Sequence, residues 1–273
     1  MFRTRHRIKS MLLMVCLLFL AGCSQSVTSS DASIVLATTT STEDTGLLDH
    51  LLPAFQKKTG ISVKVVAVGT GQAIRMGVDG NADVLLVHSR PDEDNFVDDG
   101  YGEYAHDLMF NQFYLVGPPE DPAGVKQSGT ILDAFKQIAV KQALFISRGD
   151  DSGTDKKEKS IWKGAGIRPA GDWYFSAGQG MGATLQMADE KKAYTLTDEA
   201  TFLQRRLSLQ PLLTGDPMLH NPYGIMLVSS SEKKAAGKQL IDFLVSPEGQ
   251  ELIAAFGVDA YGKNIFQPSA KKR

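Results

Sequence analysis

Cysteine is almost absent from this sequence. Only Cys16 and Cys23 occur among the 273 residues, and no cysteine follows them. A disulfide framework, a thiolate metal site and a cysteine nucleophile are therefore excluded for the chain beyond Cys23.

Long runs of positive charge are also missing. The chain has 29 Lys and Arg against 31 Asp and Glu, and no basic tract is longer than the C-terminal KKR. We therefore expect no nucleic-acid partner. Residues 1–22 hold four of the basic residues and no acidic one, so their removal would change the net charge from −2 to −6. An anionic ligand would then need local donors to hold it against a mildly repulsive field.

No apolar run is long enough to cross a bilayer as a mature helix. Residues 11–21 form an apolar run of 11 residues after a basic start, and together with the small residues that follow they predict a secretory signal over 1–22. LAGC (20–23) resembles the lipobox of bacterial lipoproteins, which implies cleavage before Cys23, acylation of Cys23 and a membrane anchor. The alternative is an ordinary signal peptide with a chance cysteine. Residues 23–32 would form a flexible tether.

Familiar enzyme motifs are missing too. The sequence contains no G-x-S-x-G, no Walker A and no H-E-x-x-H pattern, and no base–nucleophile pair is evident. The histidines are scattered without the spacing of metal ligands: His50, His88, His106 and His220. We therefore expect a protein that is not an enzyme, with no catalytic residue, no cofactor and no protein-bound metal ion.

What the chain does have is a regular alternation of strand and helix patterns. The apolar and charged fractions, 42% and 22%, are those of a globular protein, and the length suits two lobes. Apolar runs at 33–37, 61–68 and 82–89 predict strands, and the periodic segments between them predict helices that end near Gly60 and Val78. This order predicts an α/β fold with a parallel sheet covered by helices.

The alternation continues towards the C-terminus. The acidic run Asp92, Glu93 and Asp94 predicts a solvated helix start. Strands are expected in 109–119 and 218–230, and helices in 129–142, 182–192 and 234–257 with a break at Ser246-Pro247. A short strand turning into a helix is expected across 193–206, and a strand, loop and helix in turn across 143–166.

Three loops share one architecture. TTTSTEDTG (38–46), GTGQA (69–73) and SRGDDSGT (147–154) each follow an apolar strand and precede a helix, and each is rich in glycine and hydroxyl residues. Free backbone N–H groups at a helix start and the positive end of its dipole favour anions. The alternative for any single loop is simple helix capping by serine or threonine. Three such loops at the carboxyl ends of strands favour a ligand site.

Arg148 lies among the glycine and hydroxyl residues of the last loop. A guanidinium is permanently charged, and its planar donors suit oxyanions. The alternative is an ion pair with Asp150, Asp151 or Glu158. Both interpretations hold if an aspartate orients the arginine from behind a site.

The donors and acceptors of the loops indicate whether the anion carries a proton. A fully deprotonated tetrahedral dianion only accepts hydrogen bonds and requires a shell of donors, whereas hydrogen phosphate also rewards a carboxylate acceptor. TTTS and GTG contain no carboxylate, which favours a deprotonated dianion. Asp150 and Asp151 keep phosphate open.

These motifs together resemble a known family. The segments are ATTTSTEDTGLLDHLLPAF, VAVGTGQA, NADVLLVHSR, SRGDDSGT, YTLTD and NPYGIMLV. In this order they are similar to the tungstate-binding lipoproteins of bacterial tungstate ABC transporters. That resemblance implies the type II periplasmic-binding-protein fold, with two α/β lobes of mixed, mainly parallel sheets flanked by helices and joined by two crossover strands that act as a hinge.

The resemblance also implies a division of the chain. Lobe 1 would comprise 33–115 and a return segment 215–273, and lobe 2 would comprise 116–214. The crossings would fall near 115–117 and 213–217. A monomer is expected outside the cytoplasm, anchored by lipid, with an ABC-transporter permease and its ATPase as partners.

The ligand implied is a tetrahedral oxyanion, tungstate first and molybdate next, with phosphate or sulfate as alternatives. The alternative from another class, which ranks below these, is an extracytoplasmic enzyme acting on phosphorylated or sulfated substrates. The metal would be bound only as the oxyanion. The binding residues carried over are Thr39, Thr40, Ser41, Thr70, Arg148, Ser152, Gly153, Thr154, Gly180 and Tyr194. The sequence departs from the expected pattern at Asp155, where many relatives are expected to have histidine, so no further contact is assigned to that position.

Overall fold

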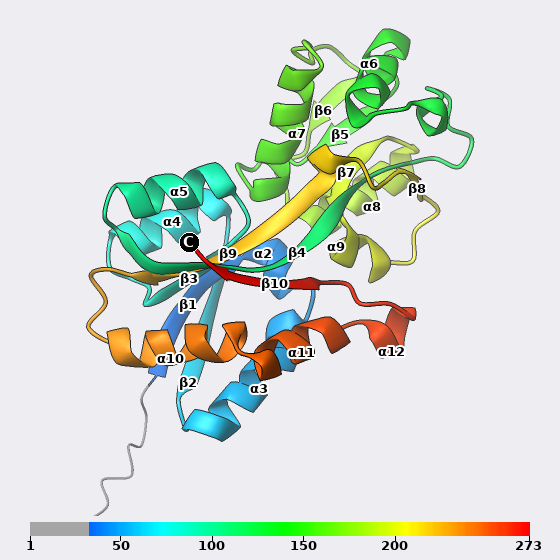
Figure 1. Ribbon diagram of the computed structural model, residues 1–273. Coiled ribbons are helices and arrows are strands. Elements are labelled where there is room, and N and C mark those ends of the chain that lie inside the picture. Colours follow the sequence, from blue (N-terminus) through cyan, green and yellow to red (C-terminus); the bar gives the residue numbers. More distant parts are fainter. Residues whose placement is uncertain (1–32) are drawn as a thin grey trace, which may run out of the picture. The chain divides into compact units, whose positions relative to one another are not determined.

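The computed structural model describes residues 33–273 (Figure 1). The predicted signal segment 1–22 and the predicted lipidation at Cys23 lie outside these residues. Within residues 33–273, no helix combines the length and apolar character needed to cross a membrane.

The larger sheet is mixed. Its six-strand path runs in the order β10-β4-β9-β3-β1-β2. The bounds are β1 (Ser33–Thr39), β2 (Ser62–Val68), β3 (Val84–Val87), β4 (Gly102–Gly117), β9 (His220–Val228) and β10 (Gln267–Lys272). β1 pairs in parallel with β2 and β3, and the other three pairings are antiparallel. The sheet is therefore less parallel than predicted, because β4, β9 and the unpredicted strand β10 pair antiparallel.

Helices cover both faces of this sheet (Figure 1). Their bounds are α2 (Thr40–Glu43), α3 (Leu47–Thr59), α4 (Thr70–Val78), α5 (Arg90–Asp98), α10 (Lys234–Val245), α11 (Pro247–Ala255) and α12 (Val258–Tyr261). The periodic leucines of α3 are buried with α10 and α11 in one apolar cluster, whereas α4 and α5 pack in a separate cluster that includes Ala73, Leu85 and Phe96. We call this part of the molecule lobe 1.

The remaining elements form a second part, which we call lobe 2. Its strands and helices are η1 (Val125–Gln127), α6 (Ile131–Lys141), β5 (Phe145–Ser147), α7 (Gly153–Gly164), β6 (Tyr174–Ser176), α8 (Met181–Lys191), β7 (Thr195–Asp198), α9 (Glu199–Leu203), β8 (Gln210–Leu213) and η2 (Pro217–Leu219). Its core is aromatic: the Phe135 and Trp162 ring centroids lie 4.4 Å apart, and Phe145 lies 5.3 Å from Trp162. Aromatic pairs in this range add stability beyond the area they bury.

One long strand is common to both lobes. Up to Gln112, β4 pairs with β9 and β10 of lobe 1, and from Phe113 onward it pairs with β7 and β8 of lobe 2. The chain returns between the end of β8 and His220, where β9 begins. The first connection between the lobes is therefore a continuous strand, and the second contains the short helix η2.

The acidic run at the start of α5 is less solvated than predicted. Glu93 is fully buried, accepts a hydrogen bond from the Ser89 N–H (3.0 Å) and pairs with Arg273 (2.9 Å). Burial raises the pKa of Glu93 to about 7. The prediction was wrong for this residue because β10, whose position is not evident from local sequence, brings Arg273 against the helix.

Candidate functional site

The three donor-rich loops lie where the sequence placed them. Residues 38–46 (the first loop) contain the β1–α2 junction, residues 69–73 (the second loop) start α4, and residues 147–154 (the third loop) join β5 to α7. Each strand ends at the loop and a helix begins within it, so free N–H groups of the first helical turn are available.

The first loop contains a helix N-cap and a cluster of buried hydroxyl groups. Thr39 and Ser41 are 1% and 3% exposed, and their hydroxyl oxygens lie 3.1 Å apart. Thr39 caps α2 by accepting from the Thr42 N–H (3.3 Å). Thr40 is the half-buried first residue of α2. Capping therefore explains Thr39 in part and leaves the Ser41 proton unassigned.

Arg148 is buried in the third loop and only partly paired. Its guanidinium is 2% exposed, and Nη2 donates to Asp150 Oδ2 at 2.5 Å. Glu158 instead accepts from Trp162 Nε1 (3.0 Å) and the Tyr174 hydroxyl (2.8 Å). The ion pair with an aspartate and a role in binding are thus compatible, because Asp150 occupies only one of the three guanidinium nitrogens.

Asp155 holds the third loop in shape. This fully buried carboxylate accepts from the N–H groups of Gly149 (3.1 Å) and Asp151 (3.2 Å), and Lys159 neutralises it at 2.6 Å. Gly149 and Asp151 both have positive φ, 62° and 57°, which costs free energy for a non-glycine residue. The position that departs from the expected pattern therefore supports the loop from behind and was missed by sequence reasoning.

Buried donors without a partner gather on the predicted site residues. Within residues 33–273, eight buried side-chain nitrogen or oxygen atoms have no hydrogen-bond partner. Half of them belong to three predicted residues: Thr70 Oγ1, Thr154 Oγ1, and Arg148 Nε and Nη1. A buried unpaired donor costs about 1–3 kcal/mol, so such a concentration is typical of a site built for a ligand.

The loops of the two lobes approach each other closely. A Cβ built on Gly69 would lie 3.8 Å from the Asp150 carbonyl oxygen, and one on Gly71 would lie 2.8 Å from Asp151 Oδ2. Next to these loops, Lys156 of α7 reaches Asp92 of α5 at 2.7 Å. The second loop of lobe 1 therefore lies against the third loop of lobe 2.

Ser152 and Gly153 lie with this group at the start of α7. Ser152 is 2% exposed and caps the helix by accepting from the Asp155 N–H (3.2 Å), which leaves its hydroxyl proton free to donate. Gly153 is the first residue of α7. Together with Thr154 they give the third loop backbone and hydroxyl donors on one turn.

Gly180 and Tyr194 are placed differently from the other predicted residues. Gly180 is the exposed N-cap of α8. The Tyr194 hydroxyl donates to Asp121 (2.9 Å) and accepts from the Ala123 N–H (2.8 Å), so it serves the internal packing of lobe 2. The Tyr194 hydroxyl is therefore already engaged by these two partners.

The carboxylates of the third loop do not supply a free buried acceptor. The two Asp150 oxygens bond Arg148 Nη2 and the Ser152 N–H (3.3 Å). The Asp151 side chain is 74% exposed. The unpaired buried groups of the predicted residues are therefore donors, which suits a ligand that only accepts hydrogen bonds.

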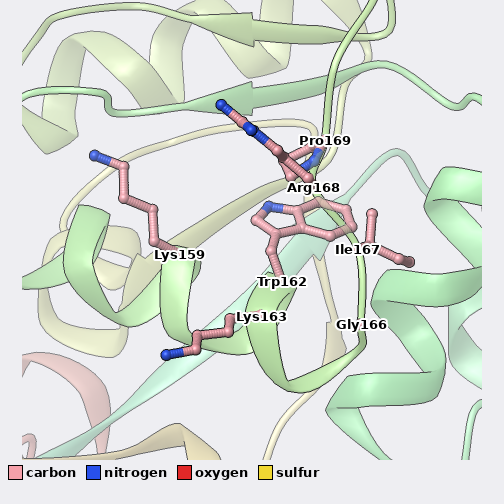
Figure 2. Close-up of a pocket in the computed structure, with 7 residues that line it drawn as sticks. All are labelled: Lys159, Trp162, Lys163, Gly166, Ile167, Arg168 and Pro169. Carbon is pink, nitrogen blue, oxygen red and sulfur yellow. The ribbon is translucent and has the colours of Figure 1, made fainter.

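A surface hollow lies on lobe 2, beside α7 (Figure 2). It is lined by Lys159, Trp162, Lys163, Gly166, Ile167, Arg168 and Pro169. Lys159, which lines this hollow, is paired with Asp155. None of the unpaired buried side-chain atoms of residues 33–273 belongs to the residues that line it.

Two α/β lobes, each carrying buried unpaired donors on a loop that begins a helix, define a periplasmic-binding-protein architecture. The PBP superfamily domain matches residues 26–248. The tungstate-binding protein TupA of Peptoclostridium acidaminophilum is 49% identical over 253 residues, which cover 90% of this chain and 88% of that protein. The chain belongs to the PBP superfamily and, within it, to the family of these TupA proteins.

Solved structures agree with this assignment. The structure of the tungstate ABC transporter from Geobacter sulfurreducens is 46% identical, with a TM-score of 0.74 and coverage of 82% of this chain and 98% of that one. The tungstate-binding protein TupA from Desulfovibrio alaskensis G20 is 40% identical, with a TM-score of 0.75 and coverage of 88% and 99%. The predicted fold class and family are therefore confirmed.

Proposed function

We propose that this protein is the substrate-binding component of an ABC importer. It binds a tetrahedral oxyanion, tungstate first and molybdate next, between its two lobes and delivers it to the membrane permease. It acts as a monomeric binding protein and performs no catalysis. The relatives named above carry the word tungstate in their names, and the unpaired buried donors of Thr70, Arg148 and Thr154 are consistent with that ligand.

The observation that carries this proposal is the clustering of unpaired buried donors. Thr70 on lobe 1 and Arg148 and Thr154 on lobe 2 hold half of the unpaired buried polar atoms of residues 33–273. Thr39, Thr40 and Ser41 of the first loop and Ser152 and Gly153 of the third complete the proposed shell. Gly180 could add a backbone donor, and Tyr194 is left out of this shell because its hydroxyl is engaged with Asp121.

The paired state of Asp150 favours a proton-free ligand over hydrogen phosphate. A carboxylate that faced the ligand would reward a protonated oxygen, but both Asp150 oxygens already accept hydrogen bonds within the loop. A shell of neutral donors with one guanidinium then selects by size and protonation. Tungstate and molybdate fit this description equally well, and the family relation places tungstate first.

We propose that the lobes close as a hinged clamp. The first crossing would lie where β4 changes partners, between Gln112 and Phe113, a few residues before the position expected from sequence. The second would lie between Leu213 and His220. Hinge closure between lobes is a common mode of ligand capture.

Isothermal titration tests the proposal. The protein is first unfolded to release any bound ligand and is then refolded. Tungstate, molybdate, sulfate and phosphate are titrated separately, and elemental analysis of the protein as purified identifies any metal it carries. We expect tungstate or molybdate to bind more tightly than the other two. Tightest binding of phosphate would change the ligand, and no binding of any oxyanion would refute the function.

We also propose an extracytoplasmic location with a lipid anchor at Cys23. The LAGC motif supports this proposal, because acylation adds membrane affinity for every buried methylene. Replacement Cys23→Ser should move the protein from the membrane fraction to the soluble fraction after cell lysis. Equal membrane retention of the variant would contradict the anchor and leave the binding function untouched.

A further inference from the structure

His88 lies in a buried polar chain beneath the first loop. Its side chain follows β3, is 6% exposed and stacks on Tyr223 with ring centroids 4.8 Å apart and an interplanar angle of 25°. Nδ1 lies 3.0 Å from Asn221 Oδ1, and Nε2 lies 3.2 Å from Thr39 Oγ1 and 3.3 Å from Ser41 Oγ. The ring is thus in direct contact with two residues of the proposed shell.

The hydrogen bonds of Asn221 determine which ring nitrogen carries the proton. Its Nδ2 donates to Asn111 Oδ1 (2.7 Å) and lies 3.2 Å from the Tyr223 hydroxyl, so its Oδ1 faces His88. An oxygen at this position accepts, and therefore Nδ1 of His88 carries the proton. The other nitrogen, Nε2, is left as an acceptor for the hydroxyls of the first loop.

The Nε2 acceptor of His88 determines the direction in which the hydroxyls of the first loop donate their protons. Thr39 Oγ1 lies 2.7 Å from Thr42 Oγ1 and also accepts from the Thr42 N–H. If Thr39 donates to Nε2 of His88 and accepts from Thr42, the Ser41 hydroxyl keeps its proton for a ligand. A protonated ring would donate from Nε2 and reverse this order, so that a hydroxyl lone pair would face the anion.

The surroundings of His88 keep its ring neutral. Burial is the main reason that its pKa is lowered to about 4, and the positive charges of Arg148 in the third loop and Lys157 on α7 lower it further. Tyr223, the stacked neighbour on β9, has its own pKa raised far above the ordinary value by burial and therefore stays uncharged.

Lobe 2 meets the same ring. A Cβ built on Gly153 would lie 2.7 Å from His88 Cε1 and 2.9 Å from Nδ1, closer than Cβ atoms come to other heavy atoms. The ring has little freedom to move away, because it is stacked on Tyr223 and bonded to Asn221. Glycine at 153 therefore allows the start of α7 to approach lobe 1.

We propose that His88 is a positioning residue of the oxyanion site. Its neutral imidazole accepts the Thr39 proton, which leaves the Ser41 hydroxyl as a donor to the ligand, and its ring is the surface on which Gly153 closes. This inference rests on the proposed function, and it adds a residue that joins the first loop, the hinge strand β9 and the third loop.

Replacement of His88 by Phe and by Gln distinguishes its role as a hydrogen-bond acceptor from the role of its aromatic ring. His88→Phe keeps an aromatic ring but removes Nε2, so the loop hydroxyls lose the acceptor that aligns them. Tungstate affinity should fall about tenfold or more, the effect of losing one hydrogen bond between a hydroxyl and the charged ligand. His88→Gln can present an oxygen to the hydroxyls and should recover most of that affinity. His106→Phe, a change at another buried histidine of lobe 1, is the matched control and should bind as the wild type does.

The outcomes of this titration are distinguishable. Equal binding by His88→Phe and the wild type would overturn the role of the acceptor, as would equal weakness of the Phe and Gln variants. If the wild type itself binds no oxyanion, the proposed function fails instead.

A double-mutant cycle tests the closing contact. Gly153→Ala alone should weaken tungstate binding about tenfold or more and shift the scattering profile of the ligand-saturated protein towards a more open form. In a His88→Ala background the same Gly153→Ala change should cost less than about threefold, because the steric conflict is gone. Equal costs in the two backgrounds would refute the contact between Gly153 and His88.

Discussion

Removal of the Arg148 guanidinium should weaken oxyanion binding more than any other single change in the third loop. Arg148 is 2% exposed, Asp150 occupies its Nη2, and Nε and Nη1 have no partner. Truncating one member of a buried, hydrogen-bonded charge pair costs about 2–5 kcal/mol. At about 1.4 kcal/mol per tenfold, this predicts a loss of roughly 30-fold to several thousand-fold in the dissociation constant.

The loss should be at the upper end of this range for Arg148→Ala. The Asp150 carboxylate, which is 19% exposed, would remain next to the dianion without its counter-charge and would repel it. The double change Arg148→Met with Asp150→Asn removes both charges, so its loss should be smaller than that of Arg148→Ala. Arg148→Lys keeps the charge without the planar set of donors and should fall between the wild type and Arg148→Ala.

Isothermal titration with tungstate measures these affinities, and thermal unfolding without ligand checks that each variant folds. Arg168→Ala is the matched control, because this exposed arginine of lobe 2 lines the surface hollow (Figure 2) and belongs to none of the three loops. It removes the same net charge and should change the dissociation constant less than about threefold, as expected for an exposed charge. An Arg148→Ala variant that binds within threefold of the wild type would place the guanidinium outside the site.

Four further changes test other parts of the structure. Thr70→Val removes an unpaired buried hydroxyl, so calorimetry should show about tenfold weaker binding with no loss of thermal stability; a stability loss without a binding loss would contradict this. Asp155→Asn should lower both affinity and melting temperature, since one loop N–H loses its acceptor at a cost of about 1–3 kcal/mol; unchanged binding would argue against a loop-shaping role. Lys156→Met breaks the half-buried pair with Asp92 and should weaken titrated binding less than about fivefold; a larger loss would make this pair a main closing contact. Burial raises the pKa of Glu158 from 4.5 to about 7. Between these pH values the folded state binds more protons than the unfolded state, so the free energy of unfolding of the wild type should fall as pH rises. In urea unfolding, Glu158→Gln should reduce this fall by an amount on the order of 3 kcal/mol, and an equal fall in the variant would refute the burial argument.

Local sequence pattern was enough to predict most helices and central strands. The helix beginning near Thr70 and the break at Ser246-Pro247 are where turn and cap residues placed them, because glycine, proline and hydroxyl side chains act on their own neighbours. Strand β10 was missed, since QPSAKK has little strand character of its own and is ordered by pairing with β4. Pairing between distant segments overrides weak local propensity.

The site was predictable to the same extent. Donor-rich loops at strand ends can be recognised from sequence, and the structure places Thr70, Arg148 and Thr154 among its unpaired buried donors. The parts that could not be predicted depend on tertiary contacts. His88 acquires its neighbours from β9 and from Gly153, and the Tyr194 hydroxyl is directed to Asp121 by the packing of lobe 2.

The insertion of lobe 2 between β4 and β9 has a consequence for how the protein folds. Gln112 pairs with His220, so the whole of lobe 2 is the loop that this pairing must close. Closing a long loop costs entropy, and chains dominated by such distant pairings refold slowly. Lobe 2 can collapse early around its own aromatic core, whereas the sheet of lobe 1 is complete only when β4 and β9 meet. The capacity to capture a ligand should therefore be among the last properties to return after dilution from denaturant.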